Sequence, residues 1–186
     1  MALATIFVTL VALVNELGMG GALIQADGLT ERQISQTYGI VIVVQFGFAA
    51  LIVATAMPIA LFFNDARLAP ILEVSSLQFV FLAFEIVPES LLMRALDFRL
   101  KAYIDTLAQL AGSLVTLALA WLGYGVWALV WGVLATSAVK AVGFTAATRF
   151  YVWPSFSLRG MRQIISFGGL LTAERVFWFF YSRPTI

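Results

Sequence analysis

Long apolar stretches, broken by short polar links, run along almost the whole chain. Six stretches are long enough to cross a bilayer, because a hydrocarbon core of about 30 Å needs about 20 apolar residues in a helix. They cover residues 2–24, 38–63, 69–93, 102–123, 125–148 and 161–182. The runs are continuous and lack the two-residue alternation of lipid-facing β-strands. We therefore predict an all-α fold, a transmembrane bundle of about six spanning helices.

The polar links contain signals for helix ends. Thr30 and Gln33 have the spacing of a capping box, which predicts that a helix begins in the polar link. Residues 64–65 (Asn-Asp) indicate a turn, and residues 123–125 (Gly-Tyr-Gly) indicate a tight reversal. The Gly-Ser pair at 112–113 indicates close helix packing. The stretches therefore connect through short links.

Composition agrees with a membrane protein and excludes several kinds of chemistry. The chain is 62% hydrophobic and 11% charged, with a mean hydropathy of +0.98, whereas soluble domains are about 25% charged. The chain has no Cys and no His, which excludes disulfides, thiolate or imidazole metal ligands, and His-dependent catalytic triads. A net charge of +1 predicts no nucleic-acid partner. We expect no cofactor, no metal and no enzymatic activity.

Basic residues alternate between the two sides of the predicted bundle. One side has Arg32, Arg94, Arg99, Lys101, Arg149, Arg159 and Arg162, and the other has Arg67 and Arg183. Because Lys and Arg in short loops stay in the cytoplasm, the first side is expected inside and both chain ends outside. An outward start with no preceding signal, and a last helix interrupted by Arg183-Pro184, indicate part of a longer protein.

Ionised residues inside the spans are candidate site residues, because each costs about 2.5–3.5 kcal/mol to insert. Glu16, Glu85, Glu89 and Lys140 lie within about eight residues of the cytoplasmic helix ends, at most about 12 Å deep. This shared depth allows Lys140 to pair with Glu16 or Glu85, and predicts a hydrated inner half closed by an apolar outer half. The alternative is that Lys140 and Glu89 only extend toward lipid head groups.

The last stretch contains the adjacent pair Glu174 and Arg175. Adjacent helical side chains point about 100° apart, so these two do not simply neutralise each other. Arg175 is a candidate for binding phosphate or pyrophosphate, because its guanidinium group matches phosphate geometry with two hydrogen bonds. The alternative is a structural ion pair of Arg175 with Glu85 or with a helix that is missing from this chain. Asp105 and Arg94 are interpreted as interfacial anchors.

Several motifs, in order, resemble one family. They are NELGMGGALIQADGLTERQ, FFNDARLAPIL, PESLLMRALDFRLKA, GYGVWALVWGVLA and ISFGGLL. Together they resemble the amino-terminal half of bacterial Wzx-type polysaccharide flippases, of the multidrug/oligosaccharidyl-lipid/polysaccharide exporter superfamily. The resemblance covers nearly the whole chain and implies an exporter with two lobes. Residues 1–148 would form a partial first lobe of five spans, 149–160 a cytoplasmic linker, and 161–186 the truncated first helix of the second lobe.

The resemblance also implies a function in the bacterial inner membrane. It implies export of undecaprenyl-pyrophosphate-linked oligosaccharide repeat units for surface polysaccharide, by alternating access. The implied partners are this lipid-linked oligosaccharide, membrane lipid, and polysaccharide polymerase and chain-length proteins. The residues expected to line the substrate cavity are Arg175, Lys140, Glu16, Glu85 and Glu174.

Other functions stay open alongside this one. The alternatives are an ion-coupled multidrug antiporter of the same superfamily, and an inactive gene remnant. An intramembrane enzyme has no support, because the sequence has neither His nor a clustered Asp motif that would bind a metal.

Overall fold

The computed structural model describes residues 30–149 and 153–154. These residues form α3 (Glu31–Phe62), α4 (Leu68–Ser75), α5 (Leu77–Arg94), α6 (Phe98–Trp121) and α7 (Val126–Thr148). The all-α prediction is confirmed. Within the described residues four spans are long and apolar enough to cross a membrane, and α4 and α5 together form one of them. These four correspond to four of the six expected stretches, and the other two, 2–24 and 161–182, lie outside the described residues.

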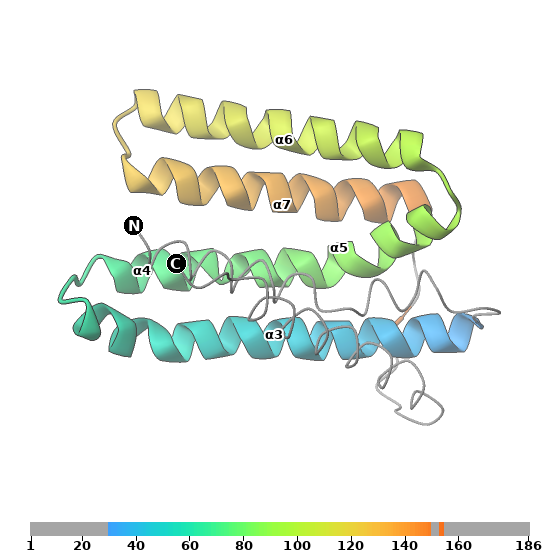
Figure 1. Ribbon diagram of the computed structural model, residues 1–186, viewed down its shortest axis with the longest axis horizontal. Helices are drawn as coiled ribbons and strands as arrows, with labels where there is room; N and C mark the ends of the chain where they lie inside the picture. Colours follow the sequence, from blue (N-terminus) through green and yellow to red (C-terminus); the bar gives the residue numbers. More distant parts are fainter. Residues whose placement is uncertain (1–29, 150–152, 155–186) are drawn as a thin grey trace, which may run out of the picture.

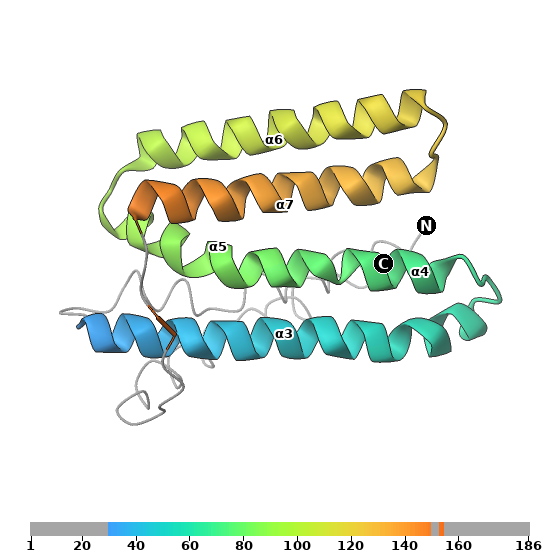
Figure 2. The same ribbon diagram turned by 180° about the vertical axis from the view of Figure 1, so that it is seen from behind.

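The spans lie side by side in one row, in the order α6, α7, α5 and α3 (Figure 1). The view from behind shows the same order (Figure 2), and direct contacts join α6 to α7, α7 to α5, and α5 to α3. Helix α4 continues the line of α5 and packs against the end of α3. Consequently α7, the last described helix in the chain, lies between α5 and α6.

Local signals place the helix ends where the sequence predicts them. Thr30 Oγ1 accepts a hydrogen bond from Gln33 N at 3.3 Å, and Gln33 Oε1 accepts one from Thr30 N at 2.9 Å, so the capping box is confirmed. Asp97 caps α6 by accepting a hydrogen bond from Leu100 N at 3.0 Å. In the reversal at 123–125 both glycines have positive φ, 82° and 55°, where a side chain would be strained.

Large apolar side chains cover much of the outer surface of the described bundle. Examples that are at least two-fifths exposed are Val43, Leu51, Met57, Leu110, Leu114 and Val142. Such side chains would be unfavourable in water over so large an area, but they match the hydrocarbon of a bilayer. Several Thr and Ser hydroxyls within the spans donate to the carbonyl one turn earlier in their own helix, as Thr37 does to Gln33 O at 2.9 Å. Both features are those of membrane-spanning helices.

Two glycines allow α6 and α7 to approach each other closely. A Cβ atom on Gly112 would lie 2.8 Å from the carbonyl oxygen of Gly132 and would also collide with Thr136. A Cβ on Gly132 would meet Thr116 of α6 in the same way. Small residues at helix contacts let backbones pack tightly in lipid, where no hydrophobic driving force joins helices. The expected close packing at Gly112 is confirmed.

We expect Gly112→Ala to lower the stability of the protein by about 1–3 kcal/mol, because α6 and α7 must separate to admit the methyl group. Gly47→Ala is the matched control, since Gly47 is also helical and a Cβ there would meet nothing within 4 Å. Thermal unfolding in detergent should show a lower Tm for Gly112→Ala, and an unchanged or higher Tm for Gly47→Ala. Equal Tm values for the two variants would contradict the close contact.

Candidate functional site

Five ionised side chains from α5, α6 and α7 form one connected network of ion pairs. Lys140 Nζ lies 3.6 Å from Glu85 Oε1 and 3.1 Å from Asp105 Oδ1. Lys101 Nζ lies 2.6 Å from Asp105 Oδ2 and 2.7 Å from Glu89 Oε1. The expected pairing of Lys140 with Glu85 is therefore present. Three carboxylates and two ammonium groups leave the network with a formal charge of −1.

Asp105 is the centre of this network, because each of its two carboxylate oxygens faces a different lysine. Its interpretation as an interfacial anchor is therefore wrong. The alternative that Lys140 and Glu89 only extend toward head groups does not describe either residue, since Lys140 pairs with Glu85 and Asp105, and Glu89 pairs with Lys101. An unpaired charge in apolar surroundings costs several kcal/mol, and these side chains avoid that cost by pairing across helices.

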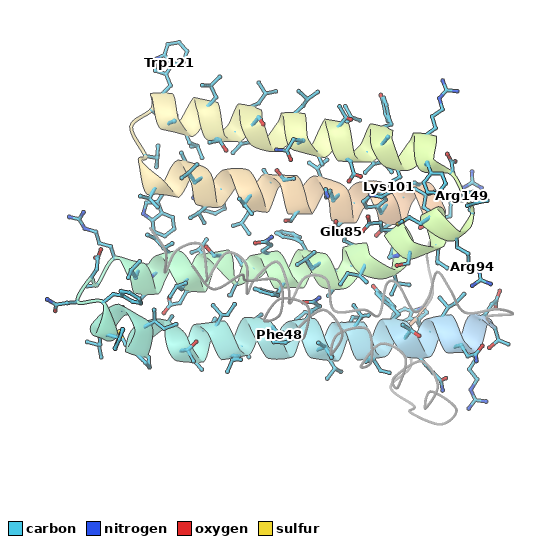
Figure 3. All side chains as sticks on the ribbon, viewed as in Figure 1. Phe48, Glu85, Arg94, Lys101, Trp121 and Arg149 are labelled. Carbon is cyan, nitrogen blue, oxygen red and sulfur yellow. The ribbon has the colours of Figure 1, made fainter. Side chains whose placement is uncertain are left out.

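The network lies toward one end of the bundle. Glu85 and Lys101 lie close together on the side of the bundle where Arg94 and Arg149 are found, far from Trp121 (Figure 3). We name this the basic end. Glu85 is nine residues from the end of α5 and Lys140 eight from the end of α7, which places them about 12–14 Å deep. The side chain of Glu85 is only 7% exposed, and Lys140 is its ion-pair partner in this network.

A groove of about 890 Å³ runs along the face shared by α5, α6 and α7. Its described lining has a charged section and an uncharged polar section, together with apolar side chains such as Leu82, Ile86 and Val133. The charged section comprises Glu85, Glu89 and Lys140. The uncharged section comprises Gln78, Gln109, Ser113, Thr116, Thr136 and Ser137. The ion-pair network therefore borders a groove within an otherwise apolar bundle.

The uncharged section extends into the half of the bundle that we expected apolar residues to close. Ser113 is fifteen residues into α6, about 22 Å from the basic end. The polar lining therefore reaches further along this face than we expected from the sequence, and closure of the outer half by apolar residues stays a prediction, because residues 2–24 and 161–182 lie outside the described residues. The sequence contained a signal for this polar face. Polar residues recur on α6 at intervals of three or four and so share one face of the helix: Asp105, Gln109, Ser113 and Thr116.

Three candidate site residues from the sequence, Glu16, Glu174 and Arg175, lie outside the described residues. Across residues 30–149 no group of three or more Asp or Glu side chains is arranged to hold a metal ion. The described part of the site therefore consists of the network and the groove.

Four apolar spans, with paired charges between them, define a multi-pass helical membrane protein. The chain belongs to the family described as polysaccharide biosynthesis protein, which matches residues 1–185. This result confirms the resemblance stated from the sequence motifs, and it places the protein among polysaccharide biosynthesis proteins.

One curated relative matches the chain over its whole length. It is the succinoglycan biosynthesis transport protein ExoT of Rhizobium meliloti (strain 1021), which is 23% identical over 186 residues. The match covers 100% of this chain but only 38% of that relative. The chain thus spans less than two-fifths of the length of the protein it matches. No solved structure matches the chain.

We expect Lys140→Met to lower the free energy of unfolding by about 2 kcal/mol, because it leaves three carboxylates with one lysine in a poorly solvated site. Adding Asp105→Asn should recover part of this loss, since the double variant returns to a formal charge of −1. Thermal unfolding in detergent compares the stability of the unaltered protein, Lys140→Met and the double variant.

The matched control for that recovery is Lys140→Met combined with Asp97→Asn. Asp97 is the N-cap of α6 and makes none of the network's ion pairs, and Asn caps helices as well as Asp does. The control removes one negative charge from α6 without relieving the network. If it recovers stability as fully as Asp105→Asn, the network is not the cause of the loss.

Proposed function

We propose that this chain forms part of an exporter that moves undecaprenyl-pyrophosphate-linked oligosaccharide repeat units outward across the bacterial inner membrane by alternating access. The observation that supports this most directly is a groove lined by paired charges inside a bundle with an apolar exterior. Family membership and the transport role in the relative's name support the same class of function.

The basic end faces the cytoplasm in this proposal, because Arg94 and Arg149 lie there (Figure 3) and Arg99 is in the first turn of α6, close to Lys101. The charged section is then within reach of a head group that enters from the inside. Its depth of about 12–14 Å suits a pyrophosphate whose lipid tail remains in the bilayer. The sugar would enter the bundle ahead of the pyrophosphate.

Among the described residues, Lys140 is the cationic side chain that binds the pyrophosphate in this proposal. In the structure it is shared between Glu85 and Asp105, so a pyrophosphate must replace these carboxylates as its partner. Because the network already has a formal charge of −1, binding an anion there requires more positive charge. Arg175, predicted from the sequence, is our candidate for supplying it. Lys140 would return to its carboxylate partners when the head group leaves.

We expect Lys140→Ala and Arg175→Ala, each in the complete exporter that contains this chain, to reduce surface polysaccharide at equal protein expression. Loss of a charge-assisted contact of about 1.5–3 kcal/mol corresponds to a decrease of about 10- to 100-fold in the affinity for pyrophosphate. Quantifying polysaccharide on cells that lack the native gene provides the measurement.

Arg67→Ala is the control, because Arg67 is exposed in the link between α3 and α4, away from the groove. It should export normally. Normal export by both Lys140→Ala and Arg175→Ala would contradict the assigned roles. A change in drug sensitivity with unchanged polysaccharide would instead favour a multidrug antiporter.

A further inference from the structure

The uncharged section of the groove has a chemistry distinct from that of the charged section. It presents two amides and four hydroxyl groups and has no ionised side chain. It begins about 16 Å from the basic end, at Gln109, and extends to about 27 Å, at Thr116. A polar surface at this depth in a membrane protein needs an explanation, because unsatisfied polar groups are costly away from water.

Hydrogen bonds within the helices account for only part of this surface. Thr116 Oγ1 donates to Gly112 O at 2.9 Å, and Thr136 Oγ1 donates to Gly132 O at 3.0 Å. Because the proton of each hydroxyl group is already in a hydrogen bond, these two groups can only accept further hydrogen bonds. Within residues 30–149, by contrast, the Gln109 amide and the Ser113 hydroxyl make no hydrogen bond. Both are exposed on the groove face of α6 and retain donors as well as acceptors.

This arrangement suits a neutral ligand rich in hydroxyl groups. A phosphate would favour the charged section, because the uncharged section has no cation to pair with it. Among the described residues that line the groove there is no aromatic side chain to stack on a planar aromatic drug. Sugar hydroxyls both donate and accept hydrogen bonds, so they complement the free donors of α6 and the acceptors of both threonines. A groove of about 890 Å³ is within the range of small-molecule sites, about 300–1,000 Å³.

We propose that the uncharged section binds the saccharide of the lipid-linked substrate, with Gln109 and Ser113 as its specificity-determining residues. This inference rests on the proposed function and adds a position for each part of the head group. The pyrophosphate lies in the charged section, nearer the basic end, and the first sugars lie deeper in the bundle. Selectivity among sugars then depends on α6 and α7, and affinity for the lipid pyrophosphate depends on Lys140.

Equilibrium binding to the complete purified exporter tests this assignment with two ligands, undecaprenyl pyrophosphate and the same lipid bearing a disaccharide. We expect the unaltered protein to bind the glycosylated lipid about tenfold more tightly, since two hydrogen bonds contribute about 1–3 kcal/mol. In Gln109→Leu/Ser113→Ala the ratio of the two Kd values should fall to about one. In Lys140→Ala both affinities should weaken while the ratio persists.

Leu107→Ala is the control variant for α6. Leu107 is 44% exposed and lies two residues before Gln109, on the opposite face of the helix from the groove. It should leave both Kd values unchanged. If the double variant has a lower Tm, the single variant Ser113→Ala replaces it, because it removes only one oxygen atom. For Ser113→Ala we expect the ratio of the two Kd values to decrease about threefold.

A ratio that stays near ten in Gln109→Leu/Ser113→Ala and in Ser113→Ala would overturn the saccharide assignment but leave the proposed function intact. Failure of the unaltered protein to bind either lipid would overturn the proposed function. A ratio near one in the unaltered protein, with tight binding of both lipids, would overturn the saccharide assignment alone.

Discussion

The arrangement of this bundle depends on pairing ionised side chains inside a membrane. Asp105 of α6 faces Lys101 with one oxygen and Lys140 of α7 with the other, and the two lysines reach Glu85 and Glu89 of α5. Each charge would be costly alone in hydrocarbon. Because the partners come from three helices, the network favours one relative placement of α5, α6 and α7, and that placement creates the groove.

Close contact between α6 and α7 supports the same geometry. Gly112 and Gly132 bring the two backbones together, while Thr116 and Thr136 satisfy their hydroxyl protons within their own helices. In lipid, such packing replaces the hydrophobic effect as the force between helices. The close α6–α7 pair therefore forms part of the groove wall, and Ser113, the residue after Gly112, lines the groove.

The sequence predicted the features that depend on local signals. Spans of suitable length, the capping box at Thr30 and the reversal at 123–125 all follow from residues close together in the chain. The pairing of Lys140 with Glu85 followed from their common depth. The role of Asp105 did not, because it requires knowing that α7 lies between α5 and α6. That order is set by tertiary contacts, and no local pattern encodes it.

The central claim is that the groove contains water. The chain has no Cys, so single cysteines introduced at Ser113 in the groove, at the exposed Val142 on α7, and at Leu96 in the link between α5 and α6 report on their surroundings separately. We predict that a membrane-impermeant thiol reagent, applied in inverted vesicles, reacts with the cysteines at 113 and 96 but not with the one at 142. Reaction at 96 alone would contradict a hydrated groove.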